Sequence, residues 1–134
     1  MEWMLVPLAY LLGSVQPGLI LVRVLRRTDV RDAGSGKTGF TNVLRTAGKG
    51  VAAVVFILDV GKGMAAPLVV RVAASSDLVE ACCAGAVMLG HVLPVFAGFR
   101  GGRGVATGLG AATGLFPWSA PIGLLTFLPV VLVT

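Results

Sequence analysis

The sequence predicts an all-α integral membrane protein, and the segregation of its charged residues is the main reason. Hydrophobic residues make up 56% of the 134 residues and charged residues 13%, which is about half the charged fraction of a soluble domain. Apolar stretches near the ~20 residues that a spanning helix needs alternate with short polar segments. We therefore expect one membrane domain over residues 1–134, with four transmembrane helices at about 3–25, 51–71, 80–99 and 105–134.

The first apolar stretch has no charged residue from Trp3 to Val22. A secretory signal is the alternative interpretation, but a signal has a basic start and a shorter apolar stretch. Here the chain starts with Met1 and Glu2. The pattern therefore favours a membrane helix.

The second and third stretches carry the ionisable groups of the apolar regions. Asp59 and Lys62 lie three residues apart and so share one helical face. They could neutralise each other, although ionisable residues within a membrane are candidates for function. Cys82 and Cys83 are neighbours that point to different sides of a helix, so we expect neither a disulfide nor a metal site. His91 could bond a neighbouring helix, accept a proton or bind an anion.

The fourth stretch, 105–134, contains no charged residue but is interrupted by Gly114, Pro117, Pro121 and Pro129. We expect it to cross the membrane and to end on the side of the N-terminus.

The basic residues indicate the orientation. Seven lie between the first two stretches, namely Arg23, Arg26, Arg27, Arg31, Lys37, Arg45 and Lys49. Arg100 and Arg103 lie between the third and the fourth. Because basic loops stay in the cytoplasm, we expect the N-terminus outside and both basic, glycine-rich loops inside. This arrangement accounts for the net charge of +5 without a nucleic-acid partner.

The first of these loops contains GSGKTG, which is similar to two nucleotide-binding motifs. In a P-loop the first glycine would stand at Arg31, and the loop would follow a buried strand. A dinucleotide-binding turn also requires a strand and a βαβ unit. Asp59 does stand 20 residues after Gly39, which is the spacing expected of the acidic residue that binds the ribose. The charged segment before the loop does not resemble a strand, so both interpretations are disfavoured.

The two loops share a chemistry that suits phosphate. Glycines allow backbone N–H groups to approach an anion, and hydroxyl, amide and cationic side chains can add hydrogen bonds. A second glycine-rich turn, GGRG, stands at the start of the fourth stretch, where a helix N-terminus favours an anion. Two such loops on one side of the membrane indicate a single phosphate-handling site; the alternative is a solvated loop attracted to anionic lipid.

Four segments, AYLLGSVQPGLILVRVL, GSGKTGFTNVLRTAGKG, LDVGKG and GHVLPVFAGFRGGRGVATGLG, resemble the bacterial acyl-phosphate:glycerol-3-phosphate acyltransferases, the PlsY family. The resemblance covers nearly the whole chain and corresponds to the N-terminal part of a longer family fold. It implies a multi-pass enzyme of the bacterial plasma membrane that forms lysophosphatidic acid for phospholipid synthesis. It also implies that acyl phosphate and glycerol 3-phosphate are the substrates, with membrane lipid around the protein and no cofactor or metal.

The resemblance also implies roles for individual residues. It gives catalytic roles to His91, Ser35 and Arg45. It gives substrate binding to Gly34, Gly36, Asn42, Lys62, Gly101, Gly102, Arg103, Gly104 and Thr107. The chain departs from the family pattern at Lys37, Phe40 and Arg103. A partner chain could supply the later helices; the alternatives to an acyltransferase are a non-catalytic membrane protein that binds phosphate or lipid, and a P-loop hydrolase.

Overall fold

The computed structural model describes residues 1–74 and 76–133, and every regular element in these two ranges is helical. The helices are α1 (Leu5–Ser14), α2 (Pro17–Arg26), α3 (Phe40–Ala47), α4 (Lys49–Ala73), α5 (Asp77–Val92), α6 (Val105–Leu115) and α7 (Ser119–Val133). Short 3-10 turns lie at Glu2–Met4, Val30–Asp32 and Val95–Ala97. The predicted all-α class is confirmed for the described residues.

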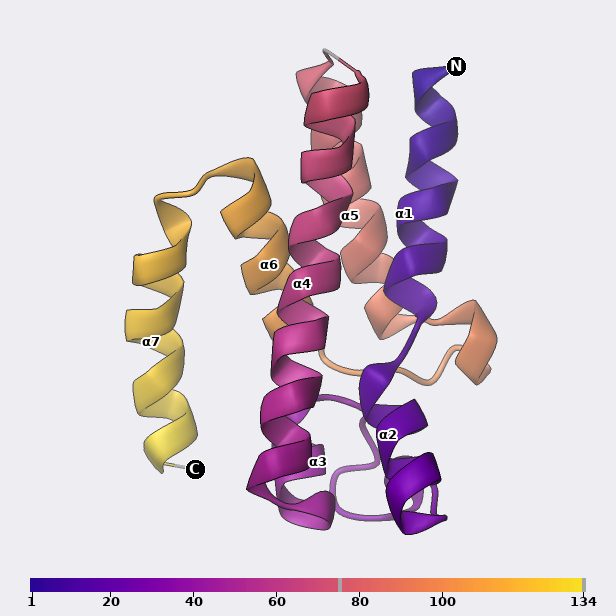
Figure 1. Cartoon of the computed structure of the whole chain (residues 1–134), viewed down its shortest axis with the longest axis vertical. Helices are drawn as coiled ribbons and strands as arrows, with labels where there is room; N and C mark the ends of the chain where they lie inside the picture. The colour runs from indigo at the N-terminus through magenta and orange to yellow at the C-terminus, as the bar shows by residue number, and fades with distance from the viewer. Residues whose placement is uncertain (75, 134) are drawn as a thin grey trace.

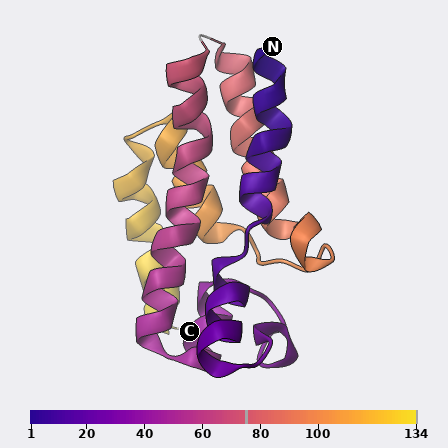
Figure 2. The ribbon, with the colours of Figure 1, turned by 45° about the vertical axis from the view of Figure 1, so that its right-hand side comes forward.

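Four helices, α1, α4, α5 and α6, stand side by side, with α2 and α3 at the end away from the N-terminus (Figures 1 and 2). Glycines allow this close packing: a Cβ on Gly110 of α6 would lie 2.0 Å from the Val60 carbonyl oxygen of α4, and one on Gly13 of α1 would lie 2.1 Å from that of Val87 on α5. Small residues at helix contacts are typical of membrane bundles, where backbones approach closely.

Three of the predicted membrane segments coincide with helical stretches that have the length and composition of a spanning helix. Among the described residues, the helical stretches Glu2–Arg26, Lys49–Ala73 and Asp77–Ala97 are long and apolar enough to cross a membrane. Their 21 to 25 residues match the thickness of a bilayer core.

The first of these stretches is broken between α1 and α2. Pro17 has no backbone N–H to continue the α1 ladder, and proline disfavours helical geometry in the residue before it. Gln16 accordingly adopts φ −110° and ψ 90°, and α2 begins at Pro17. The break becomes important at the functional site.

The prediction of one spanning helix over 105–134 is wrong. The segment forms α6, which has only 11 residues, and then α7, which turns back alongside α6 (Figure 1). Pro117 explains the division, because Phe116 before it is extended, with φ −134° and ψ 98°, and ends α6. The end of α7 therefore lies towards α2 and α3 rather than on the side of the N-terminus.

Two apolar clusters form the core. One joins α1, α4 and α5 and includes Val70, Val79 and Val87. The other packs α2 and α3 against α4 and includes Val43 and Val55. Because the second cluster anchors both ends of the first glycine-rich loop, the loop is held at a fixed place beside α4.

Candidate active site

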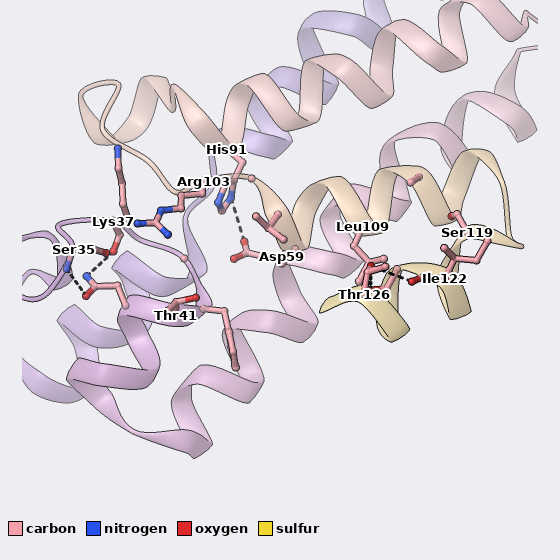
Figure 3. A pocket seen from close by; sticks show the side chains of 18 residues that line it. Ser35, Lys37, Thr41, Asp59, His91, Arg103, Leu109, Ser119, Ile122 and Thr126 are labelled. Carbon is pink, nitrogen blue, oxygen red and sulfur yellow. Dashed lines mark hydrogen bonds and ion pairs between the residues drawn. The ribbon is translucent and has the colours of Figure 1, made fainter. Parts of the chain in front are cut away.

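A cavity of about 620 Å³ lies between the first loop, the N-terminus of α6 and α7 (Figure 3). Its polar end is lined by Ser35, Lys37, Thr41, Asn42, Asp59, His91 and Arg103. Its other end is mostly apolar and is lined by Leu109, Ala112, Ile122 and Gly123, together with Ser119 and Thr126. A cavity of this kind suits a ligand with a charged head and an apolar tail.

The Asn42 side chain organises the first loop. It is 1% exposed, and its Oδ1 accepts a hydrogen bond of 3.0 Å from the Ser35 N–H. Its Nδ2 donates to the carbonyl oxygens of Val30, Ala33 and Lys37 at 2.9, 3.0 and 2.8 Å. A buried amide that is bonded on both sides fixes the backbone around it. The structure therefore assigns Asn42, predicted to bind substrate, first of all to the shape of the loop.

Gly34 and Gly36 allow the sharp turns of this loop. Their φ angles are +57° and +72°, in the region that favours glycine. A Cβ on Gly34 would also lie 2.0 Å from Asn42 Oδ1. The two glycines thus present Ser35 and Lys37, which lie beside them, to the cavity.

An ion-paired clamp joins the first loop to the second. Arg31 Nη2 lies 2.8 Å from Asp29 Oδ2, and Arg31 Nη1 donates a hydrogen bond of 2.7 Å to the Ala97 carbonyl oxygen. The Arg31 guanidinium holds the pKa of the Asp29 carboxyl well below its usual range, and Asp29 raises the pKa of Arg31. Both groups therefore stay charged over the physiological pH range.

The second loop is shaped by glycines that pack on His91. The Gly102 N–H donates to the His91 carbonyl oxygen at 3.1 Å. A Cβ on Gly102 would lie 2.1 Å from His91 Nε2, and one on Gly101 would lie 2.0 Å from the His91 carbonyl oxygen. Only glycines allow so close a contact. The structure therefore assigns Gly101 and Gly102 first of all to the placement of the His91 imidazole.

The N-terminus of α6 opens onto the cavity. Gly104, with φ +80°, precedes the helix, and Gly104, Val105 and Ala106 line the cavity. The first N–H groups of a helix have no partners within it, and its dipole favours negative charge there. The exposed Arg103 side chain stands beside them, so this wall suits an anion.

His91 lies in a buried row of ionisable side chains with Asp59 and Lys62. Its Nδ1 lies 3.5 Å from Asp59 Oδ1, and Lys62 Nζ lies 3.0 Å from the same oxygen. His91 and Asp59 both line the cavity, and Figure 3 shows the two side chains pointing toward each other. The sequence predicts for Asp59 either a structural pair with Lys62 or, as a carboxylate within an apolar stretch, a functional role of unspecified kind.

The Lys62 side chain points to the break between α1 and α2. Its ammonium donates to the carbonyl oxygens of Gly13 at 3.1 Å and Val15 at 2.6 Å, in addition to its ion pair with Asp59. An ammonium has three N–H donors, so these partners occupy it. Lys62 does not line the cavity. The structure gives it a bracing role at the break of the first helix, in place of the predicted substrate contact.

Two other predicted residues lie near the cavity without lining it. Arg45 is exposed on α3, one helical turn after Thr41, which does line it, so both share one face. Thr107 is fully buried in α6, and its hydroxyl has no hydrogen-bond partner among the described residues.

The structure excludes both nucleotide-binding interpretations. The first loop follows the 3-10 turn Val30–Asp32, and residues 1–74 and 76–133 contain no strand that could carry a P-loop or a dinucleotide-binding turn. Within the described residues, no group of three or more His, Cys, Asp or Glu side chains could hold a metal ion.

Comparison with known proteins gives the family. The family model described as "Glycerol-3-phosphate acyltransferase" matches residues 3–134. This chain belongs to that family. The match covers both glycine-rich loops and every helix described above.

Individual family members are similar over most of this chain. A glycerol-3-phosphate acyltransferase of Parasynechococcus marenigrum is 47% identical over 92% of this chain and 57% of the relative. One from Francisella tularensis subsp. holarctica is 42% identical over 94% of this chain and 62% of the relative. The chain thus spans about three fifths of the length of these two family members.

Solved structures agree with the fold. The crystal structure of PlsY, an integral membrane glycerol 3-phosphate acyltransferase, in its glycerol 3-phosphate form has a TM-score of 0.89 and 39% identity to this chain. That similarity covers 98% of this chain and 66% of the PlsY chain. A PlsY structure in a lysophosphatidic acid form has a TM-score of 0.79 and 38% identity. The arrangement of the described helices therefore matches that of the corresponding part of PlsY.

Proposed function

We propose that this chain transfers a fatty acyl group from an acyl phosphate to glycerol 3-phosphate, which yields lysophosphatidic acid and inorganic phosphate. The observation that carries the proposal is the cavity, because it joins a cationic, amide-rich end to an apolar end. Family membership and the two ligand forms of the related PlsY support the same reaction.

The polar end has room for phosphate at two walls. One wall is the first loop, with the Ser35 hydroxyl, the Lys37 ammonium and, from the rim, Arg45. The other is the N-terminus of α6 with Arg103. The first wall offers a hydroxyl and cations, and the second combines the N–H groups of a helix N-terminus with a cation, so both suit a phosphate. Two phosphate-bearing substrates can thus be brought together at one site.

The apolar end suits the acyl chain. It lies between α6 and α7, away from the two cationic walls, and Leu109, Ala112 and Ile122 line it. An acyl chain there would place its carbonyl carbon near the polar end.

The chemistry requires mainly alignment. The hydroxyl oxygen of glycerol 3-phosphate attacks the acyl carbonyl carbon, the bond from that carbon to the phosphate oxygen breaks, and phosphate leaves. The proton of the hydroxyl passes to His91 Nε2 when Asp59 accepts a hydrogen bond from Nδ1–H, since that tautomer leaves Nε2 free. Arg103 and the N–H groups of α6 stabilise the charge that develops on phosphate.

We also propose that the protein lies in the bacterial plasma membrane with both glycine-rich loops in the cytoplasm and the N-terminus outside. The basic residues near these loops support this orientation. A partner chain that supplies further helices is a second part of this proposal.

The proposal is tested in membrane vesicles that contain the chain, acyl phosphate and radiolabelled glycerol 3-phosphate. We expect labelled lysophosphatidic acid, and we expect Arg103→Ala and Ser35→Ala to reduce its formation at least about tenfold. Cys82→Ala, outside the cavity, is the matched control. Absence of product, with glycerol 3-phosphate still bound, would indicate a non-catalytic binding protein.

A further inference from the structure

The break between α1 and α2 contains a buried glutamine whose polar atoms all bind other segments. Gln16 is 3% exposed. Its Nε2 donates to the carbonyl oxygens of Gly13 at 3.3 Å and His91 at 3.2 Å. Its Oε1 accepts a hydrogen bond of 2.5 Å from the Thr38 hydroxyl. One side chain thus joins the first helix, the end of α5 and the first loop.

The contacts with Thr38 and His91 lead directly to the two glycine-rich loops. Thr38 is 1% exposed and lies between Lys37 and Gly39, which both line the cavity. The His91 carbonyl oxygen, at the other side of Gln16, also accepts the Gly102 N–H of the second loop. The two loops therefore meet at opposite ends of a single carboxamide.

Backbone packing keeps the junction rigid. A Cβ on Gly18, at the start of α2, would lie 2.0 Å from the Thr38 carbonyl oxygen, so the helix rests directly on the first loop. Lys62 donates to the carbonyl oxygens of Gly13 and Val15 on either side of the same break. The break is thus braced from α4, and Gln16 has a fixed backbone from which to reach both loops.

We propose that Gln16 is a positioning residue that sets the spacing between the two loops. The proposal rests on the function proposed above, in which each loop holds one phosphate-bearing substrate. A carboxamide is required because one end must donate to a carbonyl oxygen while the other accepts from a hydroxyl. Gln16 does not line the cavity, so its effect is on the alignment of the two loops rather than on the affinity of either.

The first experiment measures hydrogen exchange of backbone amides in the full chain in lipid nanodiscs, for peptides that cover 33–39 and 98–104. Gln16→Met keeps the volume but removes the hydrogen bonds to both loops as well as the one to Gly13, and we expect both peptides to exchange about fivefold faster. Thr38→Val removes only the first contact and should affect the first peptide alone. Gln16→Glu keeps an acceptor for Thr38 but puts a carboxylate against the His91 carbonyl, and should affect the second peptide alone.

Two results of the exchange experiment would overturn the proposal. One is unchanged exchange in Gln16→Met. The other is an identical pattern in Gln16→Met and Thr38→Val, because the glutamine would then serve the first loop only. Peptides from α5 around Gly85, away from the junction, report whether the variants remain folded. This experiment needs no enzymatic activity, so it decides the proposal even where acyl transfer by the chain fails.

The second experiment measures acyl transfer by the same variants. We expect Gln16→Met to lower kcat about 10- to 100-fold, since a misplacement of about 1 Å can cost that much. The KM for glycerol 3-phosphate should change less than about threefold, because the Asn42 network still shapes the first loop. A fall in kcat/KM that comes from KM alone would contradict the positioning role. A parent chain without product would refute the proposed function and leave the exchange result to stand by itself.

Discussion

The two glycine-rich loops bring phosphate-binding groups to one cavity, but they are held in different ways. The first loop is held by polar side chains, with Asn42 bonded to four backbone groups and Asp29 paired with Arg31. The second loop is held by backbone packing: Gly101 and Gly102, which have no side chains, lie directly against His91. The first loop should therefore fail when a hydrogen-bonding group is changed, and the second when a single methyl group is added.

The largest effect is expected from Gly102→Ala. The new Cβ would lie 2.1 Å from His91 Nε2, so either the imidazole or the loop must move. We expect acyl transfer to fall about 100-fold and the protein to lose about 1–3 kcal/mol of stability from overpacking. Product formation and thermal unfolding measure the two effects.

The control for this change is Gly85→Ala on α5, where a Cβ would meet nothing within 4 Å. Its activity should equal that of the parent chain. Full activity in Gly102→Ala would show that the close contact with His91 is not needed. The contrast between a first loop held by hydrogen bonds and a second held by glycine packing would then fail.

A smaller effect is expected from Asn42→Asp. The variant keeps an acceptor for the Ser35 N–H but turns a carboxylate oxygen toward the carbonyls that Nδ2 now binds. We expect a loss of about 1–3 kcal/mol, measured by thermal unfolding, and faster hydrogen exchange over 33–39. Thr46→Val on the same helix removes only a bond to a carbonyl one turn earlier and should change little. Equal losses in the two variants would contradict the role of Asn42.

A third effect depends on pH and tests the ion-paired clamp. Because the pKa of Asp29 is lower in the folded protein than its ordinary value of 3.8, the pairing stabilises the fold above about pH 4 and is lost as the pH falls further. Asp29→Asn should cost about 1 kcal/mol at pH 7. The difference from the parent should shrink below about pH 4.

Unfolding by denaturant at several pH values measures this difference. Asp32→Asn, which removes the same charge from an exposed side chain, is the control. A cost that does not depend on pH would show that Asp29 acts without its charge.

The smallest effect is expected from Lys37→Asn. The Lys37 side chain is exposed at the cavity, so its attraction to phosphate is screened by water and salt. Affinity for inorganic phosphate should fall about two- to threefold at low salt and less at high salt. Lys49→Asn, outside the cavity lining, is the control. A loss that persists at high salt would mean a direct contact rather than a general charge effect.

Much of the fold follows from residue patterns that act locally. The apolar stretches and the basic loops predicted the all-α membrane fold, and three of the four segments are long and apolar enough to cross a bilayer. The fourth segment was predicted as one helix because it is apolar throughout, and the prolines within it were expected to be tolerated. The helix ends just before Pro117. Whether a proline bends a membrane helix or ends it depends on packing against neighbouring helices.

The candidate site was predicted in part. His91, Ser35 and Arg103 were singled out in the sequence, and the structure brings them to one cavity. Lys62 lies behind Asp59 instead, because the break before Pro17 leaves carbonyl groups that its ammonium binds. Gln16 carried no signal of its own, since a polar residue beside a proline has many possible partners.

The sequence by itself determined the chemical groups: two glycine-rich, cationic loops beside apolar helices, with a carboxylate and a histidine in otherwise apolar segments. Those properties depend on residue type and local geometry. Only the tertiary structure decided which groups lie together, because the loops meet at Gln16 and His91 across separations of 22 and 75 residues. Contacts of that kind depend on how the helices pack, which no local pattern specifies.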